Sequence, residues 1–208
     1  MPYGFLDIAS TPAVRAAQEA NGVGEHWANF HGDRLSDRFT QAEAAFIAER
    51  DSLYMATVSE SGWPYVQHRG GPPGFIRLLD EKTLAIADFR GNRQYISTGN
   101  LAANDRAALI LMDYPHRRRL KIYAHVEPRD LSADPELAAK LTLPDYRAKV
   151  ERGLVIHLAA FDWNCPQHIT PRFSEAELAP ALGPLRARLE ALEAENRALR
   201  AKLAAKDD

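Results

Sequence analysis

The sequence predicts a mainly β protein with flanking helices, an α+β fold whose strands form a closed or nearly closed antiparallel barrel. Three observations lead to this class: short apolar segments rich in β-branched and aromatic residues are numerous, turn residues separate them, and long helices are few. Closure is favoured because it leaves few strand edges exposed. The order of the segments predicts a β-meander, and the expected strands cover residues 52–59, 64–69, 75–79, 82–87, 107–112, 120–127 and 154–161.

Capping signals predict the helices that flank this sheet. A short helix is expected over residues 11–20, where a threonine cap and a first-turn proline precede good helix formers. Thr40 and Glu43 form a capping-box pattern at the start of a second helix. Residues 134–150 predict two further short helices, interrupted at Pro144, because proline cannot donate to the helical hydrogen-bond ladder.

Composition limits both the architecture and the partners. The chain has 208 residues, of which 46% are hydrophobic and 26% charged, so one core with appendages is expected. We expect an N-terminal arm over residues 1–39, a barrel domain over 40–173 and a C-terminal helix over 174–208. The formal net charge of −2 argues against a nucleic acid or an anionic membrane as partner.

The location of the protein is also predicted from its sequence. No apolar run approaches the roughly 18 residues that span a bilayer. The first residues lack the basic and apolar pattern of a secretory signal, so we expect a cytoplasmic protein. A single cysteine, Cys165, excludes an internal disulfide framework and agrees with a reducing compartment.

The stretch over residues 87–101 has the composition of an anion-binding site. An apolar strand runs into Gly91, which permits a sharp turn, and Arg90 and Arg93 supply positive charge. If a helix begins near Asn92, then Gln94, Ser97 and Asn100 share one face close to its positive end, where phosphate oxygens are stabilised. The alternative is an ordinary connection between a strand and a helix with a solvated polar face.

A second informative segment follows the last predicted strand, over residues 161–173. It places Trp163 among polar side chains, and the ring could cover a planar ligand while Gln167, His168 and Arg172 supply hydrogen bonds and charge. The alternative is a loop anchored by its tryptophan. Cys165 and His168 make a poor zinc site because no second ligand pair accompanies them.

These two segments, together with Gln67, His68 and Arg69 after a hairpin, resemble the pyridoxamine 5'-phosphate oxidase-like family of FMN-binding split barrels. The resemblance covers residues 35–173. It implies a six-stranded antiparallel split barrel that is an obligate homodimer, with FMN in a groove between the two subunits. The cofactor-binding positions that it implies are Gln67, His68, Arg69, Gly70, Arg90, Asn92, Arg93, Gln94, Ser97, Trp163, Gln167 and Arg172.

This chain departs from the oxidase pattern, which has an arginine and a later lysine where Gln67 and Pro72 stand here. Arg69, Arg90 and Arg93 are the cations available to compensate for this loss of charge. An arginine of the oxidase substrate site is also missing near His168. The resemblance therefore implies an FMN-dependent oxidoreductase that acts on a small molecule other than pyridoxamine phosphate.

Several functional alternatives stay open at this point. NAD(P)H could reduce the flavin by transient docking, and the flavin itself would carry the chemistry, so no catalytic residue is assigned. A flavin carrier or sensor without turnover is the second reading. The third is the same fold with haem or a deazaflavin, for which the conceivable axial ligands are His68, His125, His157 and His168.

The last 35 residues predict a dimeric helix. Leucines and one asparagine recur in alternating steps of three and four, at Leu182, Leu185, Leu189, Leu192, Asn196, Leu199 and Leu203. This heptad pattern places Asn196 at an a position and predicts a short parallel coiled coil, in which opposite charges would flank the seam. The alternative is a single amphipathic helix that folds back onto its own barrel. Pro180 and Pro184 are expected to delay regular helix.

Overall fold

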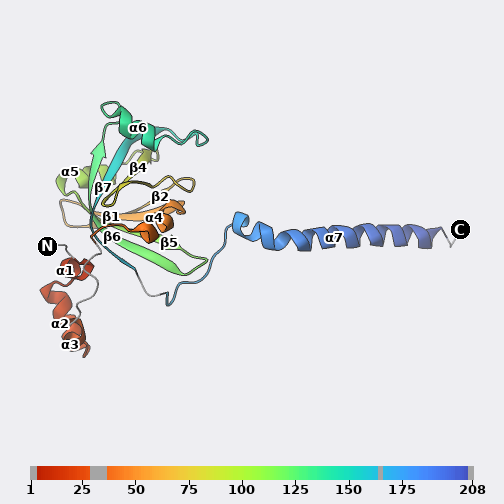
Figure 1. Cartoon of the computed structure of the whole chain (residues 1–208), viewed down its shortest axis with the longest axis horizontal. Helices are drawn as coiled ribbons and strands as arrows, with labels where there is room; N and C mark the ends of the chain where they lie inside the picture. Colours follow the sequence, from red (N-terminus) through yellow and green to blue (C-terminus); the bar gives the residue numbers. More distant parts are fainter. Residues whose placement is uncertain (1–3, 29–36, 164–165, 206–208) are drawn as a thin grey trace. The chain divides into compact units, whose positions relative to one another are not determined.

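The computed structural model describes residues 4–28, 37–163 and 166–205, which fall into two compact units. Cys165 lies outside the described residues. The first unit contains a seven-stranded sheet and six short helices, and the second contains one long helix, counted over this described part (Figure 1). The helices of the first unit are α1 (Phe5–Ala9), α2 (Pro12–Ala20), α3 (Gly24–Ala28), α4 (Gln41–Ala48), α5 (Ile96–Ala103) and α6 (Pro135–Leu141). The strands are β1 (Ser52–Val58), β2 (Pro64–Gly70), β3 (Arg77–Asp80), β4 (Thr83–Phe89), β5 (Arg106–Asp113), β6 (Arg118–Arg129) and β7 (Val150–Trp163).

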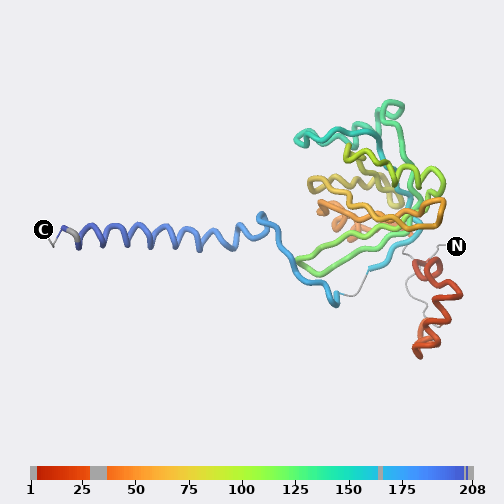
Figure 2. Tube along the Cα trace, turned by 180° about the vertical axis from the view of Figure 1, so that it is seen from behind, coloured from red at the N-terminus to blue at the C-terminus, as the bar shows by residue number. Residues whose placement is uncertain are grey.

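The predicted fold class is confirmed, because every strand pair in the sheet is antiparallel and helices flank it. The described strands number seven, as the sequence segments indicate, and not the six implied by the family resemblance. The simple meander is wrong, since the strand order is β2-β1-β5-β6-β7-β4-β3. The two views show β1 beside β5 and β4 beside β7, although neither pair is consecutive in the chain (Figures 1 and 2).

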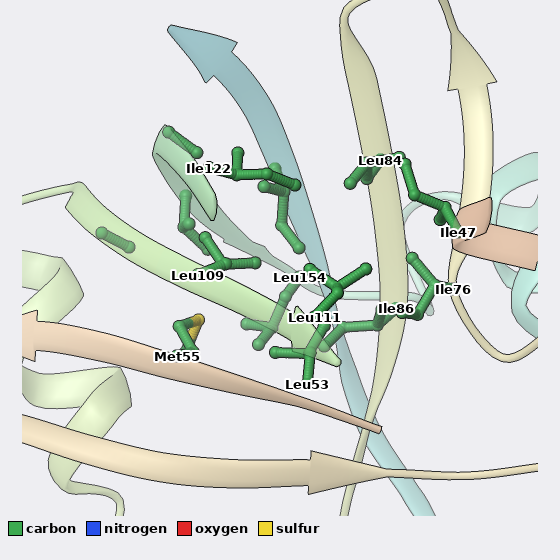
Figure 3. Close-up of a cluster of buried hydrophobic side chains, with 14 of the residues drawn as sticks. Ile47, Leu53, Met55, Ile76, Leu84, Ile86, Leu109, Leu111, Ile122 and Leu154 are labelled. Atoms are coloured by element: carbon green, nitrogen blue, oxygen red, sulfur yellow. The ribbon is translucent and has the colours of Figure 1, made fainter. Parts of the chain in front are cut away.

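The sheet curls around a single main core. Buried side chains from β1, β4, β5, β6 and β7 belong to one cluster, although β4 and β5 are not neighbours in the sheet. Figure 3 shows Leu84 and Ile86 of β4 directed into the same space as Leu109 and Leu111 of β5. Only a curved sheet brings these strands face to face, which is the geometry expected of a barrel-like fold.

A second apolar cluster lies on the outer side of β4. Residues 84–88 of β4 are all buried, which requires cover on both faces of the strand. Leu137 and Leu141 of α6 supply that cover by packing with Ala85 and Val155. Gly153 on β7 permits this approach, because a Cβ atom built there would lie 3.1 Å from side-chain atoms of Leu131 and Leu141.

The helix predictions are confirmed in part. The capping box at α4 forms, with Thr40 and Glu43 bonded as the pattern predicts. The prediction of two helices over residues 134–150 is wrong, because α6 ends at Leu141 and no second helix follows before β7. Pro144 and its neighbours instead form a loop, as the disfavoured α-region before a proline would suggest.

The second unit contains α7, a helix of 30 residues from Glu175 to Ala204. Its predicted capping box forms, since the Ser174 side chain accepts from the N–H of Glu177. The expected delay at Pro180 and Pro184 is wrong, because the helix runs through both residues. Each proline removes one hydrogen bond, but the helix is exposed and water can satisfy the freed carbonyl groups. No helix in the described ranges is both long enough and apolar enough to cross a membrane.

The main core can be tested at Leu111, which is fully buried at the centre of β5. We expect Leu111→Ala to lower the free energy of unfolding by about 2–5 kcal/mol, because it removes buried methyl groups and leaves a cavity. Leu78, which is 38% exposed on β3, provides the matched control. Leu78→Ala should change stability by less than about 1 kcal/mol in the same urea titration. Equal losses in the two variants would contradict the position of this core.

Candidate functional site

A polar cleft of about 340 Å³ opens where the C-terminal ends of β2 and β4 meet the start of α5. This volume lies in the range of small-molecule binding sites. All residues that line the cleft belong to the first unit. They are Tyr65, Gln67, His68, Arg69, Gly70, Phe75, Ala87, Asp88, Phe89, Arg90, Gly91, Asn92, Arg93, Gln94, Tyr95, Ile96, Ser97, Thr98, Tyr146 and Glu151.

The N-terminus of α5 forms one wall of this cleft. Ile96, Ser97 and Thr98 are its first three residues, and all three line the cleft. Tyr95 stands at the cap position and makes no side-chain capping bond, so the first-turn N–H groups have no side-chain acceptor there. Uncapped N–H groups and the positive end of the helix dipole make such a terminus suited to an anion.

The helix begins four residues later than the start near Asn92 that the sequence suggested. Arg93 and Tyr95 have φ angles of 64° and 53°, and this left-handed backbone is incompatible with an α-helix through them. Gln94 therefore does not share a helical face with Ser97, whereas Asn100 does lie in the helix. Two non-glycine residues in this conformation cost about 1–3 kcal/mol each, and such strain is often found at binding sites.

Two buried polar atoms at the cleft have no hydrogen-bond partner among the residues that the structure describes. They are Nε of Arg69 and Oγ of Ser97. Ser97 is only 4% exposed, so water cannot fully replace the missing partner. An unpaired buried polar group costs free energy, and its presence calls for an explanation such as a missing ligand. Both atoms suit the same ligand chemistry, because each can donate a hydrogen bond to an oxyanion.

A buried carboxylate joins two arginines beside these atoms. Asp88 is 7% exposed, and its carboxylate accepts a hydrogen bond from Arg69 and lies 3.5 Å from Nε of Arg152. Asp88 and Arg152 face each other across the β4–β7 ladder. Arg152 also donates to Oγ1 of Thr98 at 3.0 Å, so the network reaches the first turn of α5.

A second acidic residue, Glu151, accepts hydrogen bonds from two other residues that line the cleft. Its carboxylate accepts from Nε of Arg90 at 2.8 Å and from the Tyr95 hydroxyl at 3.2 Å. The hydrogen bond from Arg90 lowers the pKa of Glu151 below its ordinary value, against an opposing effect of burial. Glu151 is therefore charged at neutral pH and neutralises part of the arginine charge. Arg93 also lines the cleft, and no acidic partner joins it within the described chain.

Nine of the twelve positions implied by the family resemblance line this one cleft. They are Gln67, His68, Arg69, Gly70, Arg90, Asn92, Arg93, Gln94 and Ser97. Trp163 and Gln167 do not line it in the single chain. Arg172 belongs to the second unit, where its guanidinium lies 5.1 Å from the centre of the Tyr114 ring. The roles of all twelve residues at a cofactor stay predictions.

Trp163 instead makes contacts within the first unit. Its indole Nε1 donates to Oε1 of Glu43 at 2.7 Å, and its ring packs edge-on against Phe46. Burial raises the pKa of Glu43, but hydrogen bonds from Thr40 and Trp163 outweigh this effect and bring the net pKa below its ordinary value. Trp163 therefore ties the end of β7 to the first turn of α4, while 37% of its surface stays exposed.

Several cleft residues were not singled out from the sequence. Asp88 lies inside the stretch identified as an anion site, but no local sequence pattern marks its carboxylate as part of that site. Glu151 is brought close by the β4–β7 pairing, which joins positions more than sixty residues apart. Tyr65 and Tyr146 also line the cleft. Of these residues, Glu151 could have been identified only from the long-range pairing of β4 with β7.

The histidines considered as haem ligands are spread over the unit. His68 lines the cleft and packs edge-on against Tyr54. His125 and His157 face each other on β6 and β7, half exposed, and each lies next to a carboxylate, Asp105 and Glu127 respectively. Within the described ranges, no group of three or more histidine, cysteine or acidic side chains is placed to hold a metal ion.

A family model described as pyridoxamine 5'-phosphate oxidase matches residues 39–157, more than half of the chain. The chain therefore belongs to the pyridoxamine 5'-phosphate oxidase family. The matched region contains β1 to β6, every residue that lines the cleft and the start of β7. No curated protein sequence matches the chain.

Solved structures of similar shape include three bacterial proteins. HupZ of Group A Streptococcus is 18% identical, with a TM-score of 0.47, over 65% of this chain and 99% of its own. An FMN-binding protein from Syntrophomonas wolfei is 14% identical, with a TM-score of 0.44, over 71% and 97% of the two chains. General Stress Protein 26 from Bacillus anthracis is 12% identical, with a TM-score of 0.43, over 62% and 92%.

The contact between Trp163 and Glu43 can be tested by the change Trp163→Phe. We expect a loss of about 1–3 kcal/mol in the free energy of unfolding at pH 7, because a buried carboxylate loses a donor. The folded-state pKa of Glu43 is lowered, so its contribution is complete above the unfolded pKa and disappears as pH falls through the folded value. The difference between variant and parent should therefore shrink below about pH 4 in urea titrations. A difference that does not depend on pH would contradict this assignment.

Proposed function

We propose that the cleft binds FMN, with the phosphate of the cofactor at the N-terminus of α5. The observation that supports this most directly is the pair of unpartnered buried donors, Nε of Arg69 and Oγ of Ser97, on one cleft. The uncapped first turn of α5 lies beside them. These residues fit a phosphate, because it accepts several hydrogen bonds and carries about −1.5 to −2 charges at pH 7.

The charge of the site agrees with one phosphate group. Asp88 and Glu151 already neutralise part of the charge on Arg69, Arg90 and Arg152. The charge of Arg93 has no acidic counterpart among the described side chains, and the helix terminus adds a partial positive charge. This remaining positive potential takes the place of the arginine and lysine that the oxidase pattern has at Gln67 and Pro72.

The end of the cleft formed by β2 suits the flavin ring. Tyr65 and Gln67, both on β2, supply an aromatic ring and an amide there, and Tyr146 lines the same cleft next to Phe89 of β4. The Gln67 carbonyl accepts from the Tyr65 hydroxyl at 2.5 Å, and its amide nitrogen donates to the His68 carbonyl at 3.3 Å, so the side chain is held in place. A fixed amide next to aromatic side chains fits a planar ring with polar edges.

We further propose that the site is completed by a second copy of the chain in a homodimer. Trp63 and Val66 are among the most exposed apolar residues of the first unit, and both lie on the hairpin that carries Tyr65 and Gln67. An exposed apolar surface next to a ligand cleft is typical of a protein interface. Trp163, Gln167 and Arg172 would then approach the cofactor from the partner subunit, as closing residues of the groove.

The proposed activity is that of an FMN-dependent oxidoreductase with a small-molecule substrate. The flavin would supply the redox chemistry, accepting a hydride and passing electrons to an acceptor. The chain would orient the cofactor through Gln67 and Ser97, and the polar cleft would admit a donor such as NAD(P)H. A flavin carrier or sensor is the second candidate, and the long exposed α7, which offers a surface for a partner, favours it. The third candidate is the same fold with haem or a deazaflavin bound in place of FMN.

The phosphate position leads to a prediction for Ser97→Ala, tested by fluorescence titration with FMN and with riboflavin, which has no phosphate. FMN affinity should fall roughly tenfold, because one hydrogen bond to a charged group is lost, while riboflavin affinity stays the same. Stability should be unchanged or slightly higher, because the removed hydroxyl has no partner in the described part of the chain. Ser61→Ala, on the exposed turn between β1 and β2, is the control and should alter neither affinity. An equal loss for both flavins would place the phosphate elsewhere, and a spectrum with haem or deazaflavin bands would overturn FMN as the cofactor.

A separate prediction concerns turnover by the purified flavin-loaded protein. Anaerobic mixing with NADH or NADPH should bleach the visible absorbance of the oxidised flavin, and admitting oxygen or adding a quinone should restore it. Ser97→Ala should lower this rate only in proportion to its lower cofactor occupancy, since Ser97 is assigned to phosphate binding. If NADH, NADPH and pyridoxamine 5'-phosphate all fail to reduce the bound flavin, the carrier or sensor function is favoured over the enzyme.

A further inference from the structure

The leucines of α7 form an exposed apolar stripe in the second unit. Every α7 residue whose burial is described is exposed, and the leucines of the heptad series are 38–67% exposed. A helix with an apolar stripe is rarely stable in water unless the stripe packs against a partner. The stripe includes Leu182, Leu185, Leu189, Leu192, Leu199 and Leu203.

The helix breakers of α7 lie away from this stripe. With Asn196 at an a position, Pro180 falls at f, Gly183 at b and Pro184 at c. These positions face outward in a coiled coil, so neither the kinking residues nor the glycine interrupts the apolar seam. The structure keeps one continuous helix through all three residues, which the seam requires.

We infer that α7 pairs with α7 of a second copy of this chain, as a parallel, in-register, two-stranded coiled coil. Charges that flank the stripe are complementary in this arrangement. Arg188 at g meets Glu193 at e of the other helix, and Glu195 at g meets Arg200 at e. The two-fold symmetry doubles each pair, which gives four attractive contacts along three heptads.

Asn196 selects the parallel arrangement over an antiparallel one. An antiparallel alignment of similar overlap would also pair opposite charges, Arg188 with Glu195 and Arg186 with Glu193, so charge alone does not decide. That alignment sets Asn196 against Leu185 and leaves its amide without a partner in the seam. In the parallel register Asn196 meets Asn196 of the second copy, and the two amides can bond to each other.

The seam is short, which limits how tightly two separate helices would bind. A barrel that is itself dimeric would raise the effective concentration of the two tails and stabilise the pairing. The inference about α7 does not require that the cleft binds FMN, and the test below measures only the tails.

Disulfide formation in the full-length chain reports the orientation directly. All variants carry Cys165→Ser, so that the introduced thiol is the only one present. Leu199→Cys, at a d position, should be oxidised to a covalent dimer, because facing d residues lie within the Cα separation of about 4.4–6.8 Å that a disulfide needs. Ala194→Cys, at an outward f position, is the matched control and should react at least about tenfold more slowly.

A mixture of Leu182→Cys and Leu199→Cys chains tests the other orientation. A disulfide that joins a Leu182→Cys chain to a Leu199→Cys chain, with none between two Leu199→Cys chains, would show an antiparallel pair. This result would overturn the inference. Absence of both disulfides would also overturn it, since α7 would then be single or packed against another surface.

A charge exchange provides a second, independent readout. Arg188→Glu alone should slow disulfide formation at position 199, because it faces Glu193 of the second copy. Adding Glu193→Arg should restore the parental rate in the parallel register, where position 188 meets position 193. In the antiparallel register the double change sets like charges against each other at both sites, so a further decrease would contradict the parallel pair. High salt should reduce these differences, as expected for exposed charges.

Discussion

The buried carboxylate of Asp88 is the contact on which the site depends. Arg69 lies on β2, at one edge of the curled sheet, and Asp88 lies on β4, next to the opposite edge. Their ion pair therefore crosses the opening between the two ends of the sheet, where backbone hydrogen bonds do not join the strands. Breaking a buried pair by removing one partner typically costs 3–5 kcal/mol, so this link contributes to both the shape of the fold and the cleft.

This arrangement of the cleft has a free-energy cost when no ligand is bound. Asp88 orients Arg69 but leaves its Nε without a partner, and the left-handed backbone at Arg93 and Tyr95 places the start of α5 against the same space. Strain and unpaired polar atoms both destabilise the chain without a ligand. A phosphate at this position, as proposed, would satisfy the donors and offset the strain, and ligand binding would then be coupled to local stability at the cleft.

Local features of the sequence predicted local features of the structure. The caps at Thr40 and Ser174 formed as expected, and the strand segments matched because apolar periodicity and turn residues act over a few positions. The strand order and the start of α5 were not predicted correctly. Pairing of β1 with β5 and of β4 with β7 depends on contacts far apart in sequence, and the left-handed residues at Arg93 and Tyr95 have no local signal, since glycine was the expected turn residue.

The contacts in the cleft also join residues that are far apart in the sequence. Counting charged residues along the chain therefore gives a misleading estimate of the charge of the site. Arg69, Arg90 and Arg93 suggest a strongly basic site, yet the fold brings Asp88 into contact with Arg69 and Glu151 into contact with Arg90. In the proposed site, selectivity for an anion would then come from directed groups: the hydroxyl of Ser97, the first-turn N–H groups of α5 and the side chain of Arg93. Such groups act at short range and depend on geometry, so they favour a phosphate held in one position over diffuse attraction of any polyanion. This distinction agrees with the formal net charge of −2 and with a small-molecule ligand as the occupant of the cleft.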